Sequence, residues 1–254
     1  MQTAEDYNHG SGWSALADRY GFALLFPQQR RTNNALRSFN WFKRGDSHRG
    51  GGEPLSIHQM IEQVVAEHAV DPHRIFITAM SSGGAMTSVM LATYPEVFAG
   101  GAIIAGLPYR SAITLTQALF RMKGYGGPSD RKLEALVRGA SENVKNWPTL
   151  SVWHGSLDQT VDPSNADAIV RQWQGLHHVE GPPTRTELVD GYPRQVWCDA
   201  SGREVIEEYN ITGMGHGTPL ETGGAEGYGN SGEYMLEVGI SSTRRIAHFW
   251  GLTA

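Results

Sequence analysis

Three separate segments hold a serine, an aspartate and a histidine, the residue types of nucleophilic hydrolysis. Residues 75–84, Ile-Phe-Ile-Thr-Ala-Met-Ser-Ser-Gly-Gly, predict a strand, a sharp turn and a helix. A serine in such a turn exposes its hydroxyl, and the N–H of the next residue points at a developing oxyanion. Small residues must flank the serine two positions away, as Ala79 and Gly83 flank Ser81. We therefore predict Ser81 as the nucleophile and the Ser82 N–H as an oxyanion donor.

The neighbouring serine fits this turn less well. For Ser82 the flanking residues would be Met80 and Gly84, and methionine is too bulky where the strand and the helix nearly touch. The alternative interpretation of the segment is an ordinary glycine-rich helix start or a phosphate cradle. The segment alone leaves that alternative open.

The carboxylate follows another predicted strand. Residues 152–161 are Val-Trp-His-Gly-Ser-Leu-Asp-Gln-Thr-Val, with Asp158 five positions after Trp153. A carboxylate that orients a catalytic histidine must project from a fixed loop, which this position provides. Asp162 is the rival, but it precedes Pro163 and is typical of a helix N-terminus. We predict Asp158 as the acid, and a simple turn-forming aspartate is the alternative.

The histidine lies among glycines, in residues 213–219, Gly-Met-Gly-His-Gly-Thr-Pro. A tight loop after a strand allows His216 to approach the serine. His154 competes, but it lies at a strand end, where we expect it to pack or to hydrogen-bond locally. The sequence has one cysteine, Cys198, and no His-Glu-x-x-His motif, so we predict neither a metal nor another cofactor.

The three residues occur in the order Ser81, Asp158, His216, which is the α/β-hydrolase order. Each segment is weak evidence alone. Three segments in this order, each after a predicted strand, predict a serine hydrolase.

Alternating elements must bring these segments together. Continuous apolar runs predict buried strands, and helical spacing of apolar residues predicts helices. The predicted strands are 22–26, 74–79, 99–105, 150–153, 185–189, 194–199 and 204–211, and the predicted helices are 11–20, 54–68, 82–93, 111–122, 130–142, 164–173 and 241–250. This order predicts one α/β domain over residues 1–254, with a mostly parallel sheet and helices on both faces. Ligands of such sheets bind beyond the carboxyl ends of the strands.

Composition excludes several partners. The 254 residues are 40% hydrophobic and 19% charged, which suits a sizeable core. The net charge of −5 gives no electrostatic footprint for nucleic acid or for an anionic membrane. We therefore expect a small or polymeric substrate as partner, no nucleic acid and no membrane, and the sequence leaves homo-oligomerisation open.

Aromatic residues provide candidate walls for a pocket. The long irregular stretch 28–53 contains Trp41 and Phe42, and loops of this length are often functional. We predict that Trp41, Phe42, Tyr109 and Trp153 bind substrate, and core packing is the alternative for each.

Six segments resemble the polyhydroxybutyrate-depolymerase-type esterases, which are related to feruloyl and acetylxylan esterases. They are residues 10–23, 50–54, 81–90, 92–102, 153–158 and 213–220. The resemblance implies an α/β-hydrolase fold and hydrolysis of polyhydroxyalkanoate, feruloyl or related ester bonds through an acyl-enzyme. It also places the nucleophile, acid and base on Ser81, Asp158 and His216. Ala79 stands where the family usually has glycine.

The start of the chain departs from this family. Its members have a strand that ends in a His-Gly-Cys-type turn just before the segment that begins here at Gln2. That turn supplies a second oxyanion N–H. The resemblance thus implies a domain that lacks its N-terminal strands, with a gap in the sheet between residues 22–26 and 74–79. Either the chain is incomplete at its N-terminus, or another segment or subunit fills this gap. Unpaired backbone in a sheet centre is costly.

This departure leaves the compartment and the activity open. We expect a cytoplasmic protein if the chain start is genuine, and a secreted one if an upstream segment is missing. The competing functions are a non-catalytic binding protein of the same fold, and a peptidase or thioesterase.

Overall fold

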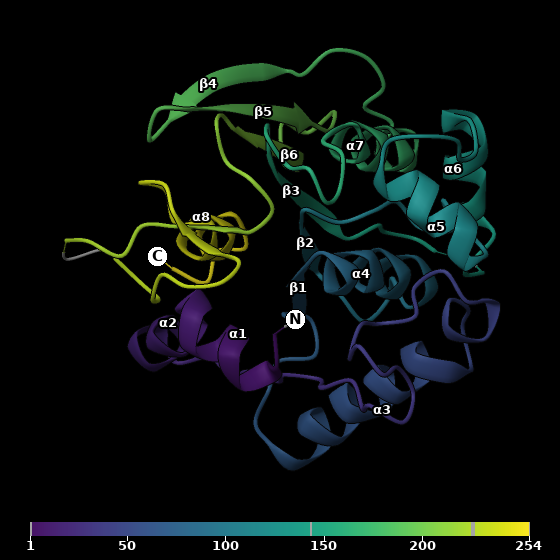
Figure 1. Cartoon of the computed structure of the whole chain (residues 1–254), viewed down its shortest axis with the longest axis horizontal. Coiled ribbons are helices and arrows are strands. Elements are labelled where there is room, and N and C mark those ends of the chain that lie inside the picture. The colour runs from purple at the N-terminus through teal and green to yellow at the C-terminus, as the bar shows by residue number, and fades with distance from the viewer. Residues whose placement is uncertain (1, 143, 225–226, 254) are drawn as a thin grey trace.

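A six-stranded sheet forms the centre of the structure, a computed structural model that describes residues 2–142, 144–224 and 227–253 (Figure 1). In spatial order its strands are β1 (Phe76–Met80), β2 (Gly100–Ile104), β3 (Thr149–Gly155), β6 (Glu204–Ile211), β5 (Tyr192–Cys198) and β4 (Arg185–Val189). The first four run parallel, and β5 and β4 are antiparallel to their neighbours. The mostly parallel sheet predicted from the sequence is therefore confirmed.

Helices cover both faces of this sheet. One side carries α4 (Ser82–Thr93), α5 (Leu115–Met122), α6 (Asp130–Arg138) and α7 (Ser164–His177), and the other carries α1 (Ala4–Ser11), α2 (Trp13–Tyr20) and α8 (Ser242–Phe249) (Figure 1). The remaining elements are α3 (Gly52–Glu67), the 3-10 turn η1 (Arg44–Asp46), and the short parallel strands β7 (Thr218–Leu220) and β8 (Met235–Glu237). None of the helices in the described residues is long and apolar enough to cross a membrane.

Two hydrophobic cores result, one on each face. Successive residues of a strand point to opposite faces. On β2, Ile103 packs into the core that contains α4 and α7, whereas Ala102 and Ile104 pack into the core that contains α2 and α8. This burial on both faces explains why the central strands are continuous apolar runs in the sequence.

The prediction of a strand at residues 22–26 is wrong. This segment has no strand partner in the described residues. Its side chains Phe22, Leu24 and Phe26 instead pack beside the core under α2 and α8. An apolar run in the sequence therefore predicts that a segment is buried. It does not predict whether the segment pairs as a strand or packs without a strand partner. The sequence also missed α1, β7 and β8, which are short.

One edge of β1 is unpaired among the described residues, because β2 is its only neighbour there. The Ser81 N–H donates to the Ile104 carbonyl on β2, 2.9 Å away. Backbone groups alternate in direction along a strand, so those of Phe76, Thr78 and Met80 point away from β2. A cavity of about 720 Å³ runs along this edge, between β1 and the segment 22–28. The resemblance implied a gap between two strands at this place, whereas the structure has one unpaired strand edge beside the packed segment 22–28.

Candidate active site

Ser81 occupies the sharp turn between β1 and α4. Its φ of 57° and ψ of −122° lie outside the regions that L-residues favour, which indicates a strained backbone. A Cβ added at Gly83 would lie 2.8 Å from the Ala79 Cβ, so glycine is needed where the helix crosses the strand. The requirement for small residues two positions on either side of Ser81 therefore has a direct steric cause, and alanine is small enough for position 79.

Ser81, His216 and Asp158 form a continuous chain of hydrogen bonds. The Ser81 Oγ lies 2.9 Å from His216 Nε2, and His216 Nδ1 lies 2.7 Å from Asp158 Oδ2. An ionised carboxylate only accepts hydrogen bonds, so Nδ1 carries the proton and Nε2 accepts from the serine hydroxyl. The structure thus brings together three residues that are far apart in the sequence.

Asp158 is held by donors on both carboxylate oxygens. Oδ1 accepts the N–H groups of Thr160 and Val161 at 2.8 and 2.9 Å, and Oδ2 accepts from His216 and from His154 Nε2, 3.2 Å away. Burial alone would raise the pKa of this carboxyl, but the hydrogen bonds from His154, His216 and Val161 outweigh it and hold the pKa well below the usual range. Asp158 is therefore ionised at neutral pH.

His154 has a role that the sequence did not reveal. Its Nε2 also lies 2.9 Å from the Val161 carbonyl oxygen, so the buried imidazole links both ends of the loop that presents Asp158. The local hydrogen bonding expected of it is present, and one partner is the candidate acid. The available signal was its position four residues before Asp158. Asp162, the rival carboxylate, instead accepts the Ser164 N–H at the start of α7, 3.0 Å away.

The Ser82 N–H lies in the first turn of α4. The first N–H groups of a helix have no acceptor within it, and the helix dipole favours negative charge there. This N–H therefore suits an oxyanion that forms beside Ser81.

The histidine loop packs closely against β3. A Cβ on Gly155 would lie 2.4 Å from the Met214 carbonyl oxygen and 2.5 Å from that of Gly215. The glycine of the Trp-His-Gly segment thus makes room for the backbone that leads to His216. The His216 ring also meets Tyr234 edge to face, with centroids 6.1 Å apart.

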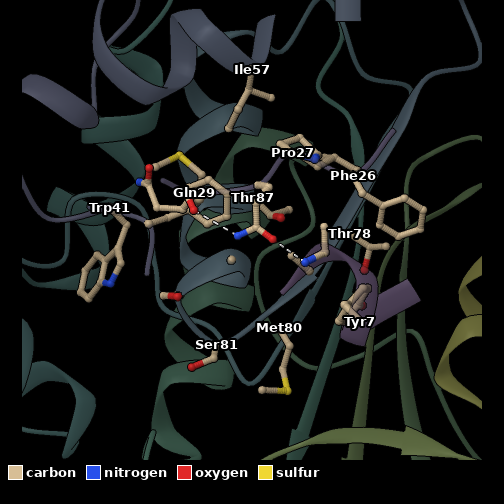
Figure 2. Close-up of a pocket in the computed structure, with 18 of the residues that line it drawn as sticks. Tyr7, Phe26, Pro27, Gln29, Trp41, Ile57, Thr78, Met80, Ser81 and Thr87 are labelled. Atoms are coloured by element: carbon tan, nitrogen blue, oxygen red, sulfur yellow. Dashed lines mark hydrogen bonds between the residues drawn. The ribbon is translucent and has the colours of Figure 1, made fainter. Parts of the chain in front are cut away.

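Two of the four aromatic candidates line the cavity. Trp41 and Phe42 line the same cavity as Ser81 and His216, and their rings meet edge to face. Figure 2 shows Trp41 and Ser81 among the residues that line it. Tyr109 and Trp153 are not among its lining residues, and their prediction as substrate walls is wrong. Both are fully buried in the core, the alternative that the sequence left open.

The contacts of Tyr109 and Trp153 explain why these side chains are buried. The Tyr109 hydroxyl donates to the Ser47 carbonyl, 3.1 Å away. Trp153 stacks on Tyr209, with centroids 3.7 Å apart, and its Nε1 donates to Ser151 Oγ. Each indole or phenol thus has its polar atom satisfied inside the protein.

A buried carboxylate fixes the loop that carries Trp41. Glu53, at the start of α3, accepts the Asn40 N–H at 2.8 Å and the Asn40 amide at 2.6 Å, and it also accepts from the Gln29 side chain. Burial raises the pKa of Glu53. These contacts hold the loop against the cavity wall.

Further cavity residues escaped the sequence analysis. They are apolar side chains of α4 and α5, namely Met86, Leu115, Ala118, Leu119 and Met122. Helical spacing of apolar residues predicts a core-facing stripe and cannot tell a cavity from a filled core.

Comparison with known proteins places the chain in a family. Residues 1–181 match the model of the family described as Esterase PHB depolymerase. The chain is 43% identical over 253 residues to poly(3-hydroxyalkanoate) depolymerase C of Paucimonas lemoignei, covering 99% of this chain and 61% of that protein. It is 27% identical over 228 residues to feruloyl esterase B of Talaromyces funiculosus, covering 86% of this chain and 63% of that one. The chain thus spans less than two thirds of either relative.

Solved structures agree on the fold. An acetyl xylan esterase from Aspergillus awamori superimposes with a TM-score of 0.75 over 99% of this chain and 85% of its own, at 20% sequence identity. Identity this low supports the α/β-hydrolase fold alone. Because the family model matches residues 1–181 of its 254 residues, the chain belongs to the PHB depolymerase esterase family.

Proposed function

We propose that this protein hydrolyses carboxylic esters through an acyl-enzyme, with Ser81 as nucleophile, His216 as base and Asp158 as the group that orients the histidine. The observation that carries the proposal is the hydrogen-bond chain Asp158–His216–Ser81 at an apolar cavity. Family membership supports the same chemistry.

The hydrogen-bond chain supports the following order of proton movements. His216 Nε2 takes the Ser81 proton as Oγ attacks the ester carbonyl carbon. The Ser82 N–H stabilises the oxyanion of the tetrahedral intermediate. Imidazolium, paired with Asp158, then gives its proton to the leaving alcohol. Water, with His216 again as the base, then attacks the acyl-enzyme, which releases the acid and restores the serine.

A polyester is the substrate class that the cavity favours. The cavity that contains Ser81 and His216 has a mostly apolar lining, which includes Trp41, Met86, Leu115 and Leu119. Such a wall suits the short aliphatic units of a hydroxyalkanoate chain. The relative with 43% identity is named as a poly(3-hydroxyalkanoate) depolymerase, whereas the feruloyl esterase is 27% identical.

We further propose that polypeptide outside residues 1–254 pairs with the free edge of β1 and supplies a second oxyanion donor. Support comes from the unpaired edge of β1 and from the part of the cavity between that edge and residues 22–28, which such a segment would fill, whereas the substrate would occupy the part beside Ser81 and His216. Loss of one oxyanion donor typically costs on the order of 10²–10³ in kcat. A chain extended at its N-terminus by such a segment should therefore turn over a short-chain ester faster by about that factor, and equal rates would refute this part of the proposal.

A fluorophosphonate probe tests the main proposal. We expect the protein to be labelled and to hydrolyse aryl acetates or hydroxybutyrate oligomers, and we expect Ser81→Ala to do neither. If the wild type is labelled neither as residues 1–254 nor with the added N-terminal segment, the non-catalytic alternative is correct. A panel of feruloyl esters, thioesters, peptide amides and polyester films then ranks the substrate classes.

A further inference from the structure

Helix α5 exposes several large apolar side chains. Leu115, Leu119 and Phe120 are 59%, 56% and 60% exposed, and Tyr125, just after the helix, is 68% exposed. The Tyr125 N–H donates to the Phe120 carbonyl at 3.0 Å, which keeps the tyrosine beside the helix end. Exposed apolar side chains grouped this closely along the chain are typical of an interaction site. We call these four residues the α5 ridge.

The ridge carries no exposed charge of its own. Residues 111–122 contain one charged residue, Arg121, and it is buried. The next residue, Lys123, donates to the Gln159 carbonyl in the loop that carries Asp158. Helices that bind anionic membranes display several free lysines or arginines on their polar face, so this composition disfavours a lipid surface.

The ridge is continuous with the candidate active site. Leu115 and Leu119, one turn apart on the same face, also line the cavity that contains Ser81 and His216. Phe120 and Tyr125 extend the apolar surface beyond the cavity lining. A soluble ester needs only the cavity, whereas a larger apolar substrate would also cover the outer part of the ridge.

The ridge is also anchored to the catalytic loop. The Asp162 N–H donates to the Met122 carbonyl at 2.7 Å, and the Asn165 side chain donates to the Arg121 carbonyl at 3.1 Å. These bonds join the last turn of α5 to the segment that follows Asp158. A surface bound by the ridge would therefore lie at a fixed position relative to the triad.

We propose that the α5 ridge docks on the surface of a water-insoluble aliphatic polyester and directs a chain segment into the cavity. This proposal rests on the proposed function and defines the physical state of its substrate. The polymer's methyl and methylene groups match the uncharged ridge, and burial of exposed leucine and aromatic side chains supplies the adsorption energy. The reaction at the triad is unchanged.

The double variant Phe120→Ser/Tyr125→Ser tests the ridge, because neither side chain lines the cavity. We expect adsorption to a hydroxybutyrate polyester film, and its hydrolysis, to fall by about tenfold, since each lost apolar contact weakens adsorption. The kcat/KM for a short soluble ester should stay within about twofold. Phe120→Leu, which stays apolar, should keep most of the film activity.

Leu188→Ser is the matched control. Leu188 is 74% exposed on β4, at the opposite end of the sheet order from β1. We expect this variant to match the wild type on both substrates. A double variant with unchanged film hydrolysis would overturn the proposal, and so would a parallel fall on film and soluble ester.

Measurements of adsorption distinguish the role of the α5 ridge from the proposed ester hydrolysis. The inactive Ser81→Ala protein should still bind the film, and the ridge substitutions should weaken that binding in the same background. If the wild type hydrolyses no ester but adsorbs through the ridge, the proposed function fails alone. A wild-type dimer that the double variant converts to a monomer, with film hydrolysis unchanged, would identify the ridge as an interface between copies and overturn the proposal.

Discussion

Replacement of Asp158 by asparagine keeps the shape of the side chain and removes its charge. The structure dictates how the amide must lie. Oδ1 accepts two backbone N–H groups, from Thr160 and Val161, at 2.8 and 2.9 Å. An NH₂ group there would face two backbone N–H groups, which can only donate. At the Oδ2 position His216 can change its tautomer, and the His154 N–H keeps the Val161 carbonyl as its acceptor, so the amide oxygen takes the Oδ1 position. The NH₂ group is then left at the Oδ2 position, 2.7 Å from His216 Nδ1.

This orientation reverses the histidine tautomer. Facing an NH₂ donor, Nδ1 must accept, so the proton moves to Nε2, which lies 2.9 Å from Ser81 Oγ. Nε2 then no longer accepts the serine proton, and the imidazolium also loses its counter-charge. The equivalent substitution in a serine protease triad lowers kcat by about 10⁴, and we expect a loss of the same order here.

Steady-state hydrolysis of a short soluble ester at neutral pH measures this loss. We expect kcat to fall with KM nearly unchanged, because Asp158 does not line the cavity. Asp162→Asn is the control, since Asp162 accepts only the Ser164 N–H among the described contacts of its carboxylate, and its kcat should stay within about twofold. Retention of more than about a tenth of the wild-type kcat by Asp158→Asn would refute the tautomer argument.

Three further predictions concern the surroundings of the triad. His154→Phe removes one donor from the Asp158 carboxylate and should lower kcat by about tenfold at constant KM, with partial recovery in His154→Gln, which keeps an N–H donor. Gly155→Ala places a Cβ 2.4 Å from a backbone oxygen of the His216 loop and should lower kcat by about 10², whereas Gly45→Ala, with no atom within 4 Å, should be neutral. Burial, and to a lesser extent the charge of Asp167, raises the pKa of Glu208 from 4.5 to about 7. The folded state therefore binds this proton more tightly than the unfolded state, and the protein loses stability as the pH rises from 4.5 to about 7. Chemical unfolding should show Glu208→Gln losing less stability between pH 4 and pH 8 than the wild type, by roughly 3 kcal/mol at most, and parallel pH curves would contradict this assignment.

Local chemistry explains which features the sequence revealed. The Ser81 turn was identifiable because its steric demand involves residues only two positions away, Ala79 and Gly83. The strands at Arg185–Val189 and Glu204–Ile211 agree with the predicted ranges, because the pattern of a strand is set by neighbouring residues. The order of the serine, aspartate and histidine along the chain predicted the α/β-hydrolase class.

The tertiary structure decided everything that depends on a distant partner. Residues 22–26 have the composition of a strand, but a strand also needs a neighbour for its backbone, and the described residues supply none. Trp41 and Trp153 are equally apolar, yet one lines a cavity and the other stacks on Tyr209. The sequence thus determined which residues can do the chemistry, through turn geometry set within a few positions. Packing between distant segments determined which side chains surround that chemistry, because burial and hydrogen-bond partners are properties of the assembled fold.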